Sequence, residues 1–418
     1  MPNPNKTKTI SSALCPNTEP DDVKLIKRQL FGRGRKNKDY YLHLEKAFGG
    51  LLDRPCFAFN GGRVAFLTVL KALGVKEGDE VLVQGLTCAV MVAPILKLKA
   101  KPIFVDIDQT LNLDPEDLKK KITPKSRAIV VQHTFGWPAK INELKEIARW
   151  HNLFFIEDCA HSLGAKYQGE YCGKFGDASF FSLGRDKIIS SVCGGVAATN
   201  NQAIARSIKM FQDGLGYPSR WWTSRQLFNP LIISEFILPF WPYGGGLALN
   251  FLQKTKMLLR PVSQSERQGI MPDGLIKKMP DELAGLALHQ FKKLERFNRH
   301  RADIADFYLR QLKNTSFALP FNQPQEGREP AFMKFPILSL KTSPEKILRK
   351  ARDMNILLGD GWRQTPVVPY DTNLQKIGYV MGSCPKAEQA AKSLINLPTH
   401  VNIGQTEAQK IVNLLKMF

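Results

Sequence analysis

Short apolar runs alternate with amphipathic segments through the first half of the chain. The apolar runs are six to eight residues long, which favours buried strands, and they lie at 55–60, 79–85, 101–107, 127–134, 153–158, 178–183 and 194–199. Helical periodicity is found between them, at 63–74, 88–98, 114–122 and 141–151. Strands of this kind alternating with helices are typical of a parallel sheet covered by helices on both faces. We therefore predict an α/β fold built on a mainly parallel sheet.

The pattern changes after residue 215. Residues 228–253 are strongly apolar but are interrupted by Pro239, Pro242 and three glycines. From Pro280 onward, residues 281–312 have the periodicity of one long amphipathic helix. We therefore predict that the chain has four parts. They are an N-terminal arm at 1–40, a large domain at 41–278 with an apolar insert at about 216–262, a connecting helix at 279–313, and a smaller α+β domain at 314–418.

Composition and charge narrow the function. The chain has 418 residues and 43% hydrophobic content, which is ample for a large core, and its formal net charge is +21. This charge favours an anionic partner such as a phosphate-bearing substrate, nucleic acid or an acidic membrane surface. The basic residues are spread along the chain and no zinc-finger or other metal-ligand spacing appears, so we expect neither nucleic-acid binding nor a metal site. Seven cysteines at irregular spacings indicate reduced thiols in a cytoplasmic protein.

One predicted strand runs directly into two acids. The stretch FFIEDCAHSLGA, residues 154–165, brings Glu157 and Asp158 to the end of an apolar run, with a helix-like stretch after it. Burying an unpaired carboxylate is costly, so either the pair faces water or one acid meets a cation. In a parallel sheet, ligands bind at the carboxyl ends of the strands, which is where Asp158 falls.

Two further segments carry candidate chemistry. In ASFFSLGRDKIISSVCGG, residues 178–195, Lys187 lies in an apolar surround that favours its neutral, nucleophilic amine, and Ser182 precedes it by five residues. In FNGGRVAF, residues 59–66, Gly61 and Gly62 separate a strand from a helix whose first amides, at Arg63 and Val64, would point at an anion. By themselves these features also fit a surface lysine and a tight turn.

Together the segments describe a pyridoxal phosphate site. Lys187 would form a Schiff base with the aldehyde, and Asp158 would hold the pyridine nitrogen protonated. The glycine turn and Ser182 would bind the phosphate. In this interpretation, the pyridinium ion is the cationic partner that allows Asp158 to be buried.

The same segments resemble the DegT/StrS family of pyridoxal-phosphate-dependent sugar aminotransferases, in the aspartate aminotransferase superfamily of fold type I. The resemblance covers most of residues 40–215 and 279–418, in the order of the family. The stretches that carry it are 59–66, 75–90, 101–108, 111–148, 154–165, 176–200, 282–301 and 394–415. It implies a large pyridoxal-phosphate domain followed by a smaller one.

The resemblance assigns roles to residues. Lys187 would be the Schiff-base lysine and Asp158 the partner of the pyridine nitrogen. Ala160, on the same strand face as Asp158 if the strand continues, would pack against the ring, and His161 would lie beside the phenolic oxygen of the ring. A histidine that only bonds backbone is the alternative for His161. The phosphate contacts would come from Ser182, Gly62 and the amides of Arg63 and Val64.

Several positions depart from the pattern of the family. Cys88 stands where many members place an aromatic ring on the cofactor face, and Gly61-Gly62-Arg63 replaces Ser-Gly-Thr in the phosphate turn. We expect the charge of the arginine to replace the lost hydroxyl contact. Val192-Cys193 replaces Gly-Glu, and Ile276 stands where an asparagine reaches the phosphate of the neighbouring subunit. The expected Schiff base does not depend on these positions, whereas the details of phosphate binding and the identity of the substrate do.

The resemblance implies amino transfer in a homodimer. The amino donor would be an amino acid, L-glutamate by resemblance, and the acceptor a keto sugar carried on a nucleotide, for cell-surface polysaccharide or glycoconjugate. The dehydratase branch of the family has histidine in place of the lysine, so Lys187 argues for transamination. Two alternatives stay open: a pyridoxal-phosphate enzyme of another reaction class, and a non-catalytic sensor or binding protein on the same fold.

The apolar insert has two interpretations. A spanning helix needs about 20 unbroken apolar residues, and the prolines and glycines divide residues 228–253, so we predict no transmembrane span. Two apolar arms around a Pro/Gly bend would instead pack against a partner subunit or enter one leaflet at the inner face of the membrane. Basic residues flank the stretch on both sides, at Arg220, Arg225, Lys254, Lys256 and Arg260, where they could meet lipid phosphates.

Overall fold

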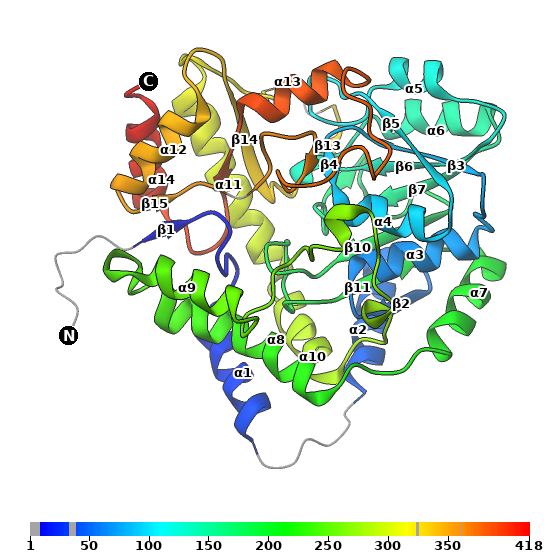
Figure 1. Ribbon diagram of the computed structural model, residues 1–418, viewed down its shortest axis with the longest axis horizontal. Helices are drawn as coiled ribbons and strands as arrows, with labels where there is room; N and C mark the ends of the chain where they lie inside the picture. Colours follow the sequence, from blue (N-terminus) through cyan, green and yellow to red (C-terminus); the bar gives the residue numbers. More distant parts are fainter. Residues whose placement is uncertain (1–8, 33–38, 323–325, 360) are drawn as a thin grey trace.

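Seven strands form the central sheet of the computed structural model, which describes residues 9–32, 39–322, 326–359 and 361–418 (Figure 1). Their order across the sheet is β2-β11-β10-β7-β6-β3-β5, and all neighbours are parallel except β11, which is antiparallel to β2 and β10. The strands span Cys56–Phe59 (β2), Glu80–Gln84 (β3), Lys101–Val105 (β5), Ser126–Gln132 (β6), Phe154–Asp158 (β7), Ala178–Ser182 (β10) and Gly195–Ala198 (β11). Each predicted apolar run overlaps one of these strands, and the predicted α/β fold is confirmed.

Helices connect the strands and pack against the sheet. They are α3 (Gly62–Ala72), α4 (Ala89–Lys97), α5 (Pro115–Lys121), α6 (Ile141–Trp150) and α7 (Gln202–Asp213). Side-chain caps fix two of the starts: Asp114 accepts the Glu116 amide before α5, and Asn201 accepts the Ala203 amide before α7. Because α3 and α4 follow β2 and β3, their N-termini lie at the carboxyl edge of the sheet.

The C-terminal part has its own antiparallel sheet. It consists of β12 (Phe317–Ala318), β14 (Lys334–Ser339) and β17 (Leu394–Pro398), with α12 (Pro344–Asp353), α13 (Pro385–Ser393) and α14 (Gln405–Leu415). Short strand pairs join this part to the rest of the chain. β16 (Val367–Val368) pairs with β4 (Thr87–Cys88), and β15 (Ile356–Leu357) pairs with β1 (Ile10–Ser11). β13 (Arg328–Glu329) pairs with β8 (Lys166–Tyr167), and β8 also pairs with β9 (Glu170–Tyr171). One hydrophobic core runs through both parts, so the domain boundaries stay a prediction.

The predicted continuous helix over 281–312 is wrong. The structure has two helices, α10 (Asp281–Phe291) and α11 (Leu294–Leu312), separated at Lys292 and Lys293. The Lys293 ammonium lies 2.6 Å from Asp21, 3.1 Å from Glu19 and 3.2 Å from Asp22. These acids lie at the start of α1 (Pro20–Phe31), which belongs to the predicted N-terminal arm and precedes α2 (Tyr40–Leu52); residues 1–8 and 33–38 of that arm lie outside the described residues.

The apolar insert forms a helical hairpin, as the two predicted arms require. Its first arm is α8 (Arg220–Ile232) and the π-helical turn η2 (Ile233–Ile237), and its second is α9 (Gly245–Lys254), after the short turn η3 (Trp241–Tyr243). In Figure 1 the hairpin is green and lies beside α1 and below the C-terminal sheet. Within the described chain, no helix combines the length and the apolar character needed to cross a bilayer, which agrees with the prediction from the prolines and glycines.

Candidate active site

The sheet brings the predicted residues to one edge. β7 ends at Asp158 and β10 ends at Ser182, and these parallel neighbours finish on the same side. Ser182 lies opposite Gly195 of β11, and Gly195 lies opposite Phe59, the last residue of β2. The glycine turn that follows β2 therefore lies close to Ser182, although 120 positions separate Gly62 from it.

The turn and Ser182 form a tight cradle. A Cβ atom on Gly62 would lie 2.9 Å from Cβ of Ser182 and 3.2 Å from its hydroxyl oxygen. A Cβ on Gly195 would lie 2.4 Å from the Gly62 amide nitrogen, so this position also requires glycine. The sequence pattern indicates Gly195 only as part of the predicted strand at 194–199. The cradle exposes backbone donors that a side chain would otherwise cover.

One predicted phosphate donor is used elsewhere. The amide of Val64 donates to the Gly61 carbonyl at 3.0 Å, because the first turn of α3 closes with an i to i−3 bond. The first-turn amides that have no intrahelical acceptor are then those of Gly62 and Arg63. The free amides at the start of α3 are therefore shifted by one residue from the predicted pair, and their binding of an anion stays a prediction.

The charge of Arg63 is also paired within the protein. Its guanidinium pairs with the buried carboxylate of Glu266 and donates to the Pro261 carbonyl at 2.9 Å. The suggestion that Arg63 replaces the missing hydroxyl by charge is therefore not supported by its contacts. No sequence motif indicated Glu266, which lies in the short turn η4 (Glu266–Gln268) that follows the hairpin.

The two adjacent acids of β7 have different surroundings. Glu157 accepts backbone amides from Gly173, Phe175 and Gly176 at 2.7–2.8 Å, and its other contact is His133 Nε2 at 3.2 Å. Burial raises the pKa of Glu157, but His133 and these amides lower it more, so the pKa lies below its usual value. Glu157 is thus an ionised structural residue that anchors the 173–176 loop.

The carboxylate of Asp158 receives fewer hydrogen bonds from the protein than that of Glu157. Its side chain is 3% exposed, and Oδ1 accepts the Ala160 amide at 2.9 Å. Burial raises the pKa of Asp158 to about 6, although the Ala160 bond and the positive charge of Lys187 act in the opposite direction. A cationic ligand beside this carboxylate would therefore be bound favourably and would stabilise the buried negative charge.

The prediction that Ala160 continues the strand is wrong. β7 ends at Asp158, and residues 159–164 form turns, not the helix-like stretch expected from the sequence. The Asp158 side chain caps this turn by accepting the Ala160 amide, which bends the chain away from the extended direction. Ala160 therefore contributes its backbone N–H to Asp158, and a methyl contact with a ring stays a prediction.

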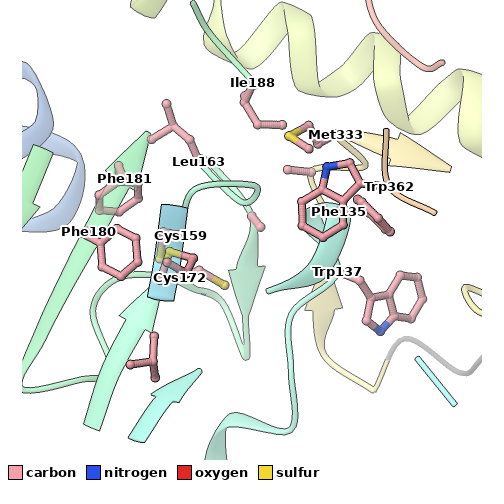
Figure 2. Close-up of a cluster of buried hydrophobic side chains, with 14 of the residues drawn as sticks. Phe135, Trp137, Cys159, Leu163, Cys172, Phe180, Phe181, Ile188, Met333 and Trp362 are labelled. Atoms are coloured by element: carbon pink, nitrogen blue, oxygen red, sulfur yellow. The ribbon is translucent and has the colours of Figure 1, made fainter. Parts of the chain in front are cut away.

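His161 is buried and held in one orientation. Its Nδ1 accepts the Phe135 amide at 3.3 Å, and its ring stacks on the Phe135 ring at 5.7 Å with the Trp362 ring edge-on at 5.1 Å. Figure 2 shows Phe135 and Trp362 lying together. Burial lowers the pKa of His161 well below its usual value, and Lys187 lowers it further. The imidazole is therefore neutral with its proton on Nε2, so the backbone bond proposed as the alternative occupies only one nitrogen.

Lys187 is fixed through its backbone by distant parts of the chain. Its carbonyl accepts the side-chain amide of Asn17, and its Nζ lies 4.0 Å from Asp186. The buried Arg301 donates to Asn17 and, at 2.8 Å, to the Ile188 carbonyl. Asn17 and Arg301 lie in the arm and in α11, so no local motif could have connected them with Lys187.

Cys88 also belongs to this region. It is the last residue of β4, directly before α4. Burial raises the pKa of its thiol, and the Val90 amide and the charges of Lys187 and Arg63 lower it. The charges of Lys187 and Arg63 therefore act on Cys88, and its position at the face of the cofactor ring stays a prediction.

The residues fit pyridoxal phosphate. The amides of Gly62 and Arg63 with the Ser182 hydroxyl match a phosphate, and the poorly solvated Asp158 matches a protonated ring nitrogen. Lys187 supplies the amine, and the Nε2 proton of His161 suits a ring oxygen. Phe180, Phe181 and Ile188, which Figure 2 labels, are buried in the hydrophobic core near Ser182 and Lys187 in the sequence.

The chain is similar to several known proteins. The chain is 41% identical to the GDP-perosamine synthase of Escherichia coli O157:H7 over 39% of this chain and 45% of that one. It is 24% identical to the spore coat polysaccharide biosynthesis protein SpsC of Bacillus subtilis over 89% and 87%. Its fold matches Helicobacter pylori PseC, an aminotransferase involved in pseudoaminic acid biosynthesis, with a TM-score of 0.74 and 21% identity over 99% and 100% of the chains. The DegT/DnrJ/EryC1/StrS aminotransferase family profile matches residues 21–230 and 251–416, and the chain belongs to this family.

Proposed function

We propose that this pyridoxal-phosphate-dependent aminotransferase moves an amino group from L-glutamate to a keto group of a nucleotide-linked sugar, in the formation of cell-surface polysaccharide or glycoconjugate. The observation that carries the chemistry is the meeting of Lys187, Asp158 and the Gly62–Ser182 cradle at one sheet edge. The sugar acceptor is supported by relatives named for perosamine and spore-coat polysaccharide synthesis. The +21 charge suits a diphosphate-bearing substrate.

Pyridoxal phosphate, when bound, supplies an electron sink for the carbon that loses or gains nitrogen. Lys187 is the proposed Schiff-base lysine, and its amine, once free, moves the proton at the substrate carbon. Asp158 would keep the ring nitrogen protonated, and the Nε2–H of His161 would donate a hydrogen bond to the ring oxygen. Ser182 and the amides of Gly62 and Arg63 hold the phosphate.

The proposed setting is a cytoplasmic homodimer at the inner face of the membrane. Seven free cysteines in the described chain support a reducing compartment. The apolar hairpin at 228–253 supports a peripheral position. The resemblance to a family with shared active sites supports the dimer, and Ile276 marks a position where the partner contact would differ.

A substrate panel tests the function. The purified holoenzyme is incubated with L-glutamate and each of a set of nucleotide-linked keto sugars, and 2-oxoglutarate and amino sugar are measured together. We expect equimolar formation of both products with at least one acceptor. Release of pyruvate or carbon dioxide without amino sugar would identify another reaction class, and absence of any spectral change with amino acids would favour a binding protein.

A further inference from the structure

The outer side of the insert hairpin, residues 220–257, carries apolar side chains that its own fold does not use. On the inner side, Ile233, Ile237, Leu249 and Leu258 are buried in a small separate core with partly buried neighbours from the hairpin and the N-terminal arm. On the outer side, Phe236 and Phe240 are 58% and 47% exposed. A stable hairpin needs only the inner set.

The second arm repeats this arrangement. Leu247 and Phe251 are 76% and 63% exposed and lie four residues apart, on one face of α9. In the described residues, eight of the eighteen exposed large hydrophobic side chains lie between positions 217 and 257. This concentration distinguishes the hairpin from the scattered exposed apolar residues that any surface has.

The charged residues of the hairpin and its flanks are almost all cationic. Residues 217–262 contain five basic residues and one acid, Glu235. That acid is neutralised by Lys27 of α1 at 2.6 Å. Lys254 and Lys256 follow the apolar face of α9, and the Arg225 guanidinium lies 6.0 Å from the centre of the Trp221 ring. Three of the six tryptophans of the chain lie at 221, 222 and 241, and this residue type is enriched at membrane–water interfaces.

The tip of the hairpin also lies outside the residues that the family profile matches. The family profile matches residues 21–230 and 251–416 and omits 231–250. The omitted segment holds Phe236, Phe240 and Leu247. Catalysis common to the family therefore does not explain why these side chains are apolar and exposed.

We propose that the outer face of the hairpin docks on an anionic lipid bilayer, with Phe236, Phe240, Leu247 and Phe251 among the acyl chains and Lys254 and Lys256 at the lipid phosphates. A second copy of the chain is the competing occupant. In a symmetric dimer the same patch meets itself near the axis, and five uncompensated cations would then face five others. An anionic surface satisfies both the apolar and the charged side chains.

Docking would place the active site beside the membrane. Two contacts connect the hairpin region with segments of the site: Gln226 of α8 accepts from Arg185, two residues before Lys187, at 3.2 Å, and Glu266, nine residues beyond the hairpin, pairs with Arg63. An acceptor sugar delivered at, or passed on to, the membrane would therefore reach the site from a nearby surface. The inference rests on the peripheral position in the proposed function and specifies the docking face and the lipid chemistry, and it does not depend on the chemistry at Lys187.

Vesicle binding by the full-length holoenzyme tests the proposal. Co-sedimentation is measured with vesicles of phosphatidylcholine alone and of phosphatidylcholine with phosphatidylglycerol, at low and high salt. The apolar variant is Leu247→Ser with Phe251→Ser, and the matched control is Trp150→Ser with Met210→Ser, which changes two side chains that are 87% and 76% exposed outside the hairpin. Light scattering reports the oligomeric state of each protein, and melting temperature reports its folding.

We expect binding to the anionic vesicles that salt weakens, and at least a tenfold lower partition coefficient for the apolar variant. The control should stay within about twofold of the parent protein, and Lys254→Gln with Lys256→Gln should reduce the salt dependence. No binding at low salt, or equal binding by the apolar variant, would overturn the proposal. Dissociation of a dimer by the apolar variant would also overturn it and assign the face to a second copy. None of these readouts requires turnover.

Discussion

Replacing Asp158 by asparagine should change stability and activity in opposite directions. The asparagine side chain has nearly the same shape, and its carbonyl can still accept the Ala160 amide. What it loses is the negative charge. In the cofactor-free protein that charge is buried at 3% exposure, and burial raises the pKa of Asp158 from 3.8 to about 6.

The pKa shift of Asp158 determines how large the change in unfolding free energy is and at which pH it occurs. A carboxyl whose folded pKa is raised stabilises the protein fully below the unfolded pKa, and this stability is lost as the pH rises through the folded value. A shift from 3.8 to about 6 corresponds to about 3 kcal/mol of unfolding free energy, at about 1.4 kcal/mol per unit. The cofactor-free parent should therefore lose about 3 kcal/mol relative to Asp158→Asn between pH 3.8 and pH 6.

Denaturant unfolding from pH 4 to pH 8 measures this difference. Because both proteins share every other titrating group, subtracting the two curves isolates Asp158. With pyridoxal phosphate bound, the parent should no longer lose stability in this window, since a protonated ring nitrogen offsets the buried charge. Activity should fall at least tenfold to a hundredfold in the variant, as expected for loss of a charge-assisted bond of about 1.5–3 kcal/mol. Parallel stability curves, or unchanged kinetics, would refute the role of Asp158.

Three further variants test the rest of the site. Lys187→Ala should leave the protein without covalently fixed cofactor after borohydride treatment and reduce turnover to background; a labelled peptide from elsewhere would exclude this lysine. Gly195→Ala should weaken cofactor retention by roughly tenfold or more, because its Cβ would lie 2.4 Å from a backbone nitrogen, whereas Gly216→Ala has open space and should be neutral in fluorescence titration. Glu157→Gln should lower the unfolding free energy by about 3 kcal/mol, while the exposed Glu295→Gln changes it by less than 0.5 kcal/mol; equal values would show that the amide contacts are not stabilising.

The sheet and the main site residues were predictable because each depends on a short, local pattern. Apolar runs identified the strands, and Asp158 and Ser182 lie at their ends. Parallel strands end at one edge, so residues from separate segments had to meet there. The glycine pair marked the close approach at the start of α3, which the contact of Gly62 with Ser182 confirms.

What the pattern could not predict depends on contacts between distant segments or on the exact closure of a turn. The break before α11 has no proline or glycine, and it coincides with Lys293 reaching the acids of α1. The first turn of α3 uses the Val64 amide internally, a choice of one hydrogen bond that composition does not reveal. Asn17 and Arg301, which are 284 positions apart in the chain, together support Lys187.

The pair Glu157–Asp158 shows why two adjacent acids take different roles. Successive residues of a strand point to opposite faces, so β7 sends one carboxylate toward the 173–176 loop and the other toward the lysine. Backbone amides and His133 solvate Glu157 so well that its pKa falls, and a further cation would gain little there. Asp158 receives the Ala160 amide and keeps a raised pKa, so a bound cation stabilises it most. The carboxylate that the protein solvates least is therefore the one that is chemically available to a protonated ring.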